Sequence, residues 1–353
     1  MNRIGILTFL HNGNYGSCLQ AYALQRVLRT MGNDCEHIDY QPDLQEKIRN
    51  MIRCGNSLRL LVDGRKKRKV RTEQSGIQKK YKLIQTFYEQ HMNLSPVCRN
   101  HEALIQIEKR YDILMCGSDQ IWNPVWMNPS YFLDFAPPDK PRIAYAASLG
   151  ISVVPGRRKQ NLIRHKLSLF DAVSVREEEG ARILVSMTGL RPSVVPDPVC
   201  LLTGKEWEEV AAPMQMSRKS MVCYFIGENP AYWDQAEAIG LEKGLEPLVI
   251  PVTADAYEQG RFALLDGAGP EEFLGAILNA EEICTDSFHG LAFGTIMGKK
   301  VHLIRRDSDD SRESKNSRTD HFLREVKNKG LENMRQEGLN WLDENIRNIQ
   351  KTI

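Results

Sequence analysis

The feature that most constrains the fold is the alternation of short apolar runs with polar loops and helical patterns. The apolar runs are Arg3–Leu10, His37–Tyr40, Tyr111–Cys116, Arg142–Ala147, Asp171–Val175, Pro192–Val195, Ser220–Ile226, Pro247–Val252, Ile283–Thr285 and Lys300–Ile304. Nearly continuous apolar runs are typical of strands buried on both faces of a parallel sheet. Strands that alternate with helices predict an α/β fold with doubly wound sheets.

The alternation is interrupted once, at the Pro-containing segment Pro196–Trp207, which we expect to be a linker. We therefore predict an N-terminal Rossmann-like domain over 1–197 and a second one over 198–335. Within the second half, Thr253–Ala268 is expected to be an irregular loop, and a helix is expected to begin at Asp320.

Charge is unevenly distributed along the chain. The net charge is +2 over 353 residues, but Gln45–Leu83 carries thirteen Lys or Arg against three acidic residues. A total this close to zero gives no support for nucleic-acid binding. The helical insertion over 45–93 contains the basic cluster Arg65–Arg71, which is either a solvated helix or a surface for an anionic membrane or a diphosphate-linked substrate.

The eight cysteines are scattered, without a C-x-x-C pair or zinc spacing, which favours a reducing compartment. The N-terminal run is too short for a signal peptide, and no uncharged run approaches the length of a membrane span. We expect a cytoplasmic protein, with peripheral contact at the inner membrane face if the basic cluster binds lipid.

The segment Glu281–Ile304 predicts a strand, a tight loop, a helix and a second strand. Asp286 or Ser287 can cap the helix, and His289 lies in its first turn. Free amides and the positive end of the helix dipole make such a position a candidate anion site. His289 is either an anion ligand or a loop histidine that caps its own helix.

Polar residues also follow the predicted strands of the first half. They are Asn14 and Ser17 in the first loop, Ser118, Asp119, Gln120 and Trp122 after Cys116, and Arg176 after Val175. Ligands of open α/β sheets bind at the carboxyl ends of the strands. No Walker A motif or metal-binding pair stands at a strand end, so we expect an anionic substrate handled with neither metal nor cofactor.

Five motifs occur in an order that resembles the polysaccharide pyruvyl transferase family. They are IGILTF with NYGSCLQAYALQ, YDILMCGSDQIWNP, SVREEE, PDPV, and TDSFHGLAFGTIMGKK with a later NSR. The resemblance covers nearly the whole chain and is weakest over 45–93. It implies a GT-B-like fold, with two Rossmann-like domains facing across a cleft, and a final helix (336–353) packing back on the first domain. It implies transfer of pyruvate from phosphoenolpyruvate to sugar hydroxyls as a ketal, in capsule, exopolysaccharide or cell-wall polymers.

The resemblance also implies roles for single residues. Many family members have Arg-Leu-His-Gly where this chain has Ser287-Phe288-His289-Gly290, and we infer that Arg318 of Asn316-Ser317-Arg318 replaces the lost charge. Arg176 and Arg318 would neutralise the donor, and His289 would bind phosphate or act as a general acid. These three side chains are expected to converge on one anion.

Two other residues have alternative roles. Asp119 is the candidate base for the acceptor hydroxyl, or its side chain only shapes the loop. Trp122 stacks on a sugar ring, or it is structural. The remaining candidate substrate-binding residues are Asn14, Ser17, Ser118, Gln120, Ser287, Asn316 and Ser317.

The predicted donor is phosphoenolpyruvate and the predicted acceptor is a sugar or a lipid-linked saccharide. The alternatives are a glycosyltransferase of the same fold that uses a nucleotide sugar, and a non-catalytic saccharide-binding protein.

Overall fold

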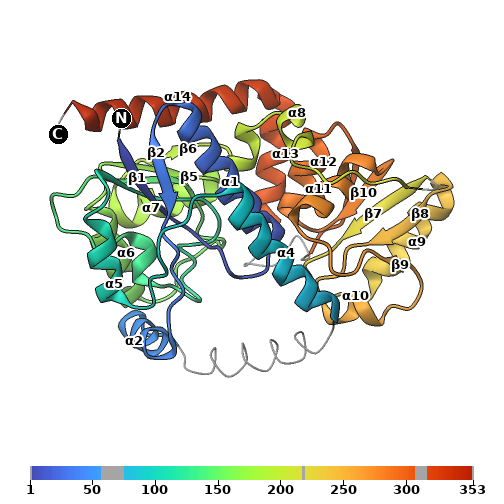
Figure 1. Ribbon diagram of the computed structural model, residues 1–353, viewed down its shortest axis with the longest axis horizontal. Coiled ribbons are helices and arrows are strands. Elements are labelled where there is room, and N and C mark those ends of the chain that lie inside the picture. The colour runs from blue at the N-terminus through green and yellow to red at the C-terminus, as the bar shows by residue number, and fades with distance from the viewer. Residues whose placement is uncertain (1, 57–74, 217–218, 307–315, 352–353) are drawn as a thin grey trace. The chain divides into compact units, whose positions relative to one another are not determined.

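The computed structural model describes residues 2–56, 75–216, 219–306 and 316–351 (Figure 1). The basic cluster Arg65–Arg71 lies outside these residues. The chain divides into two compact units. Unit 1 comprises Met1–Arg65, Tyr88–Leu201 and Arg312–Ile353, and unit 2 comprises Lys66–Phe87 and Leu202–Ser311. Residues 312–335 are therefore grouped with the first unit, whereas the sequence placed them in the second domain.

Unit 1 is built on a parallel six-stranded sheet in the order β2-β1-β3-β4-β5-β6. Its strands are β1 (Arg3–Leu7), β2 (Asp34–His37), β3 (Ile113–Cys116), β4 (Arg142–Ala147), β5 (Ala172–Val175) and β6 (Ser193–Val194). The strands β3 and β4 are buried along their whole length. All pairings are parallel, so the carboxyl ends of the strands lie along one edge.

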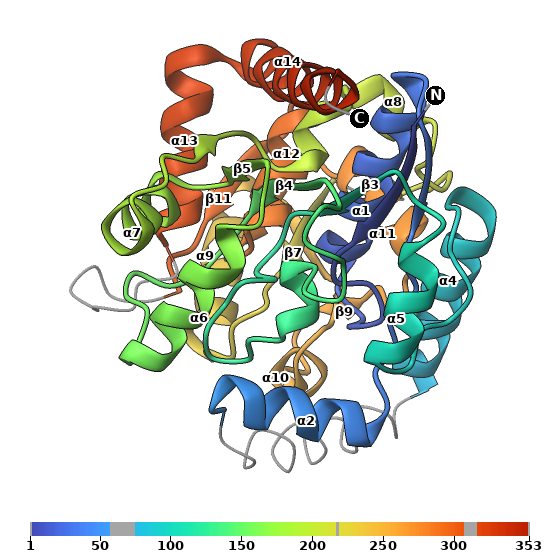
Figure 2. The same cartoon turned by 90° about the vertical axis from the view of Figure 1, so that its left-hand side faces the viewer.

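Helices pack around this sheet. They are α1 (Tyr15–Thr30), α2 (Leu44–Cys54), α5 (His101–Glu108), α6 (Arg157–Leu167), α7 (Glu178–Thr188), α13 (Ser317–Lys329), α14 (Leu331–Gln350) and the 3-10 helices η1 (Pro129–Phe132) and η2 (Pro198–Leu201). Figure 2 shows α2, α5 and α6 on the side of unit 1 that faces the viewer. The long helix α4 (Ser75–His91) contributes residues to both units.

Unit 2 repeats the architecture with a parallel five-stranded sheet in the order β11-β10-β7-β8-β9. Its strands are β7 (Ser220–Tyr224), β8 (Glu246–Val249), β9 (Ala263–Leu264), β10 (Glu282–Thr285) and β11 (Lys300–Leu303). Its helices are α8 (Gly204–Glu208), α9 (Ala231–Lys243), α10 (Ala254–Glu258), α11 (Pro270–Asn279) and α12 (Phe288–Ile296). The predicted class, two parallel-sheet α/β domains, is confirmed.

The chain passes from unit 1 to unit 2 between Leu201 and Leu202, within the predicted linker Pro196–Trp207, but this segment is regular and buried. It forms η2 and α8, and Asp197 and Trp207 are almost completely buried. The helix η2 packs between α1 and α14 within unit 1. The two prolines led to the prediction of a linker, but in the structure they lie in and beside the buried 3-10 helix η2.

Three other expectations need correction. The strand expected at His37–Tyr40 is Asp34–His37, because Asp39 and Tyr40 leave the sheet to bond the segment around Cys98. The region Thr253–Ala268 is partly regular, since it contains α10 and β9. The helix expected from Asp320 begins at Ser317. In the described parts of the chain, no helix has the length and apolar character needed to cross a bilayer.

Candidate functional site

The carboxyl edge of the unit 1 sheet carries a strained turn. Asp119, which follows β3, has φ 75°, and Ala146 near the end of β4 has φ 52°. The left-handed region costs a residue with a Cβ about 1 kcal/mol or more, so surrounding contacts must hold both conformations. The amide of Ser148 donates to the Asp119 carbonyl at 2.9 Å, and the register of β4 against β5 shifts at the same place. Strain of this kind often marks a functional site.

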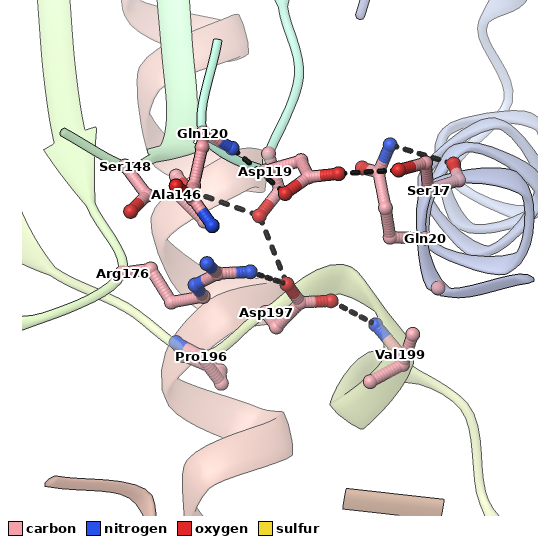
Figure 3. A network of polar contacts seen from close by, with 12 residues as sticks. Ser17, Gln20, Asp119, Gln120, Ala146, Ser148, Arg176, Pro196, Asp197 and Val199 are labelled. Carbon is pink, nitrogen blue, oxygen red and sulfur yellow. Dashed lines mark hydrogen bonds and ion pairs between the residues drawn. The ribbon is translucent and has the colours of Figure 1, made fainter. Parts of the chain in front are cut away.

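The Asp119 carboxylate accepts hydrogen bonds on both oxygens (Figure 3). Ser17 Oγ donates to Oδ2 at 2.5 Å, and the Gln120 amide donates to Oδ1 at 2.8 Å. Ser17 Oγ itself accepts from Asn12 Nδ2 at 2.9 Å. Asp119 is only 9% exposed. The structure therefore brings Ser17 and Asp119 together, and the carboxylate is already engaged by donors from its own unit.

Asn14 stabilises the start of α1, at the same edge of the unit 1 sheet. Its side chain caps α1 by accepting from the amides of Gly16 at 2.8 Å and Ser17 at 3.3 Å. The cap fixes the first turn of α1, and this turn carries Ser17 to Asp119.

A buried ion pair lies next to this turn. Asp197 Oδ2 accepts from Arg176 Nη1 at 2.7 Å and from Ser118 Oγ at 3.0 Å, as Figure 3 shows in part. The amide of Val199 donates to Asp197 Oδ1 at 3.1 Å. Glu177 approaches Arg176 Nε at 3.6 Å and accepts from Ser148 Oγ at 2.6 Å. Burial disfavours the charged guanidinium, but Asp197 and Glu177 outweigh it and raise the pKa of Arg176 above its ordinary value.

This pairing changes the argument for Arg176. We expected that buried cations would need a substrate anion, whereas two carboxylates of unit 1 already balance the Arg176 charge. Asp197 was missed because its segment was interpreted as a linker. The signal was available, since Asp197 is the only polar side chain of the PDPV motif.

Arg318 lies in the first turn of α13 and reaches the turn after β3. The Gln120 carboxamide, with its oxygen turned toward this side chain, accepts from Arg318 Nη1 at 2.8 Å and Nη2 at 3.3 Å. The backbone carbonyl of Asn316, just before the helix, accepts from Thr319 Oγ1 at 2.7 Å. Ser317, the first residue of the helix, is half-buried. Arg318 and Gln120 therefore come together within unit 1.

Trp122 belongs to the core, which corrects the sugar-stacking hypothesis. Its side chain is completely buried, with the indole stacked on Phe132 at a centroid distance of 5.2 Å. Its Nε1 donates to the Tyr131 carbonyl at 3.1 Å. A ring covered in this way has no face left for a sugar.

In unit 2, the start of α12 has the predicted form. Ser287 is the N-cap, and its Oγ accepts from the Gly290 amide at 3.4 Å. The helix lies close to β10, since a Cβ on Gly290 would overlap the Thr285 side chain. His289 is 6% exposed in the first turn. The order of the sheet puts this turn beside the carboxyl end of β7.

A cation that the sequence did not single out lies at this helix start. Arg306 Nε donates to Asp286 Oδ2 at 2.9 Å, and its Nη2 donates to the Asp286 carbonyl at 3.1 Å. The Asp286 carboxylate also accepts from the amides of Ile226 and Gly227, at 2.7 and 2.8 Å. Asp286 thus joins the loops after β7 and β10, and the Arg306 guanidinium pairs with it at the edge that carries His289.

His289 belongs to unit 2, whereas Arg176 and Arg318 belong to unit 1. Their convergence on one anion stays a prediction.

One group of possible metal ligands comes together in the described residues: Glu178, His321 and Glu325, of α7 and α13. A guanidinium already lies among them. Arg324 Nη2 donates to Glu178 Oε2 at 2.6 Å and lies 3.1 Å from His321 Nδ1. Lys329 Nζ pairs with Glu325 Oε2 at 2.8 Å, so each of the two carboxylates already has a cationic side chain beside it.

Solved structures with a similar fold are sugar-nucleotide enzymes. The UDP-GlcNAc 2-epimerase from Neisseria meningitidis bound to UDP-GlcNAc has a TM-score of 0.54 and 10% identity, over 99% of this chain and 100% of that one. A putative UDP-N-acetylglucosamine 2-epimerase from Listeria monocytogenes has a TM-score of 0.54 and 10% identity, over 97% and 88%. At such identity the likeness shows the fold alone, which is GT-B-like. A search of the curated proteins gives no match.

The sequence comparison is more specific than the structural one. The family model described as polysaccharide pyruvyl transferase matches residues 14–308. This range includes the α1 cap, the turn after β3, the Arg176–Asp197 pair and the start of α12. The match bears out the resemblance carried by the motifs, and the chain belongs to the polysaccharide pyruvyl transferase family.

Proposed function

We propose that this protein transfers the pyruvyl group of phosphoenolpyruvate to two hydroxyls of a saccharide, forming a ketal and releasing phosphate. Family membership supports a transferase that acts on a polysaccharide. The observation that carries the choice of donor is the start of α12. A capped helix N-terminus with His289 in its first turn is a set of groups suited to a phosphate, and Arg306 holds the adjacent loop through Asp286.

The reaction needs two additions to the same carbon. In the first, a saccharide oxygen bonds to C2 of phosphoenolpyruvate, the π electrons of the C2–C3 bond take a proton at C3, and the hydroxyl loses its proton. In the second, another hydroxyl oxygen bonds to C2 as the bond from C2 to the phosphate oxygen breaks, and its proton leaves with phosphate. The enzyme must therefore supply an acid for C3, a base for the first hydroxyl and cations for the donor.

We assign His289 to the donor, as phosphate ligand or as the acid for C3. Arg318 is the candidate partner of the donor carboxylate, because its planar guanidinium suits a bidentate contact. Arg176 is bound to Asp197, so we assign it to holding the turn after β3 in shape. Ser118 serves the same end, since its Oγ lies 3.0 Å from Asp197 Oδ2 and 2.9 Å from the Ala146 carbonyl and can donate its one proton to either.

We expect the acceptor to be a sugar of a bacterial surface polymer, carried on a lipid. Contact of the protein with an anionic membrane through Arg65–Arg71 stays a prediction. Charge reversal in that cluster should weaken liposome binding in a salt-dependent way.

The test is donor selection. The purified protein is incubated with phosphoenolpyruvate or with nucleotide sugars, each with surface-polysaccharide fragments as acceptors, and release of phosphate or nucleotide is followed. We expect acceptor-dependent phosphate release from phosphoenolpyruvate. Turnover of a nucleotide sugar instead would assign the glycosyltransferase alternative, and saccharide binding without turnover of any donor would assign the binding protein.

A further inference from the structure

A histidine and an aspartate form a pair at the carboxyl edge of unit 1, outside the network of Figure 3. His11 follows β1 and Asp39 follows β2, and these strands are neighbours in the sheet. His11 Nε2 lies 2.6 Å from Asp39 Oδ1. The Asp39 side chain is 9% exposed, whereas the His11 side chain is 28% exposed. The carboxylate is therefore buried, and the imidazole reaches the surface.

Asp39 is held in place from several directions. Gln41 Nε2 donates to both carboxylate oxygens, at 3.0 and 3.1 Å. The Asp39 amide donates to Ser95 Oγ at 3.0 Å, and its carbonyl accepts from the Cys98 amide at 2.8 Å. Burial alone would raise the pKa of Asp39, but the hydrogen bonds from His11 and Gln41 lower it below its ordinary value. An ionised carboxylate accepts a hydrogen bond from Nε2–H, which leaves the lone pair of a neutral imidazole on Nδ1.

This pair stands next to the turn that contains Asp119. Asn12, the residue after His11, donates to Ser17 Oγ, and Ser17 donates to Asp119. Asp119 is only 9% exposed and each of its oxygens already accepts a hydrogen bond, so little of the carboxylate is open to a substrate hydroxyl. His11 has a partner on one nitrogen and exposure on the ring, which is the arrangement of an oriented general base.

We propose that His11 is the general base for the acceptor hydroxyl and that Asp39 is its positioning residue. This inference rests on the proposed function and replaces Asp119 in that role. His11 Nδ1 takes the proton of the first hydroxyl as that oxygen bonds to C2 of phosphoenolpyruvate. Protonation of C3 consumes one proton, so the first addition neither gains nor releases a proton overall once His11 has returned its proton to water.

The groups that face the pair do not compete for this proton. The Tyr88 ring packs edge-on against His11 at a centroid distance of 5.7 Å, and burial raises the pKa of its hydroxyl well above the ordinary value. Burial also raises the pKa of the Cys98 thiol, to about 11. The Arg99 guanidinium attracts Asp39 and helps to lower its pKa.

The test compares His11→Gln, Asp39→Asn and Asp119→Asn in the phosphoenolpyruvate-dependent transfer assay, with His165→Gln on the exposed face of α6 as the matched control. His11→Gln should lower kcat by at least about a hundredfold, the ordinary contribution of a general base. Asp39→Asn should lower kcat less and change the acidic limb of the pH profile, while KM for phosphoenolpyruvate stays the same. His165→Gln should behave as wild type.

Three results would contradict the inference in different ways. Transfer at the wild-type rate by a folded His11→Gln, or by His11→Asn if the first variant misfolds, overturns the base assignment and leaves the proposed function intact. An unchanged pH profile in Asp39→Asn overturns the positioning role. Absence of transfer by the folded wild-type protein overturns the proposed function, and the inference with it.

Discussion

At the scale of the residue, the start of α12 carries the sharpest prediction. Replacing His289 with Gln should lower turnover at least about a hundredfold, because the group would hold the phosphate or move a proton in the rate-determining chemistry. The free energy of unfolding should change little, because Gln keeps a polar side chain at this nearly buried position. Steady-state phosphate release and urea unfolding measure the two effects separately. A folded variant with wild-type turnover would remove His289 from the site.

Asp197 should be important for stability. Replacing it with Asn removes the carboxylate that lies 2.7 Å from the buried Arg176 guanidinium, and removing one partner of a buried pair costs about 3–5 kcal/mol. Urea unfolding of Asp197→Asn measures this loss. The control is Asp234→Asn, which breaks the exposed pair with Arg261 and should change stability little. Equal, small effects of both substitutions would show that Arg176 does not depend on Asp197.

The residues that the sequence misjudged share one property, namely burial. Trp122 and Arg176 stand after strands, where ligands bind, and their residue types suit a sugar and an anion. A one-dimensional pattern does not reveal that Phe132 covers the first and that Asp197 neutralises the second. Ser287 and His289 were placed correctly because a helix N-terminus is a local feature, which is determined by the cap residue next to the helix.

At the scale of the element, β2 and α1 are joined by a buried histidine that should make stability depend on pH. His37 is completely buried, and its Nε2 lies 2.9 Å from the Ala21 carbonyl. Burial lowers the pKa of His37 to about 4, against the weaker effect of its backbone hydrogen bonds. Between about pH 6.5 and 4 the unfolded chain binds a proton that the folded one does not, so stability is lost as the pH falls, by up to about 3 kcal/mol.

Unfolding in urea at about pH 7 and about pH 4.5 tests this dependence. His37→Gln keeps a polar group near the Ala21 carbonyl and removes the titration, so it should lose less stability between the two conditions than wild type does. Equal losses would assign the acid sensitivity to other groups.

The helix α14 depends on a close contact at Gly338. A Cβ there would lie 2.6 Å from both Leu201 of η2 and Tyr145 of β4. Gly338→Ala should therefore destabilise the protein by about 1–3 kcal/mol through overpacking, even though Ala favours helices. Asn340→Ala, at an exposed position of the same helix, is the control and should be neutral or slightly stabilising. Thermal unfolding that ranks Gly338→Ala equal to the control would contradict this packing.

Elements with a strong local pattern were predictable, and those defined by tertiary contacts were not. The strand β4 and the beginning of α12 agree with the sequence prediction, because a continuous apolar run defines the first and an adjacent cap residue defines the second. The start of α13 was expected three residues too late because Asn316-Ser317-Arg318 has the composition of a loop. The sequence also gave no sign that η2 would be enclosed by α1 and α14, because the partners lie far apart in the chain.

At the scale of the whole molecule, the order of five motifs predicted the family and the two α/β units, both of which are confirmed. Motif order is a property of the whole chain and tolerates errors at element boundaries. Motif order does not identify the donor or the acceptor, because enzymes of different chemistry share the same architecture.

The most direct test of the central claim is detection of the ketal itself. The protein is incubated with phosphoenolpyruvate labelled with ¹³C at C2 and with a surface-polysaccharide acceptor, and the product is examined by NMR, with His289→Gln as the control. We predict a labelled quaternary ketal carbon on the saccharide, formed in equal amount to released phosphate and much reduced in the variant. A saccharide that stays unlabelled while the folded wild-type protein transfers a sugar from a nucleotide donor would contradict the claim.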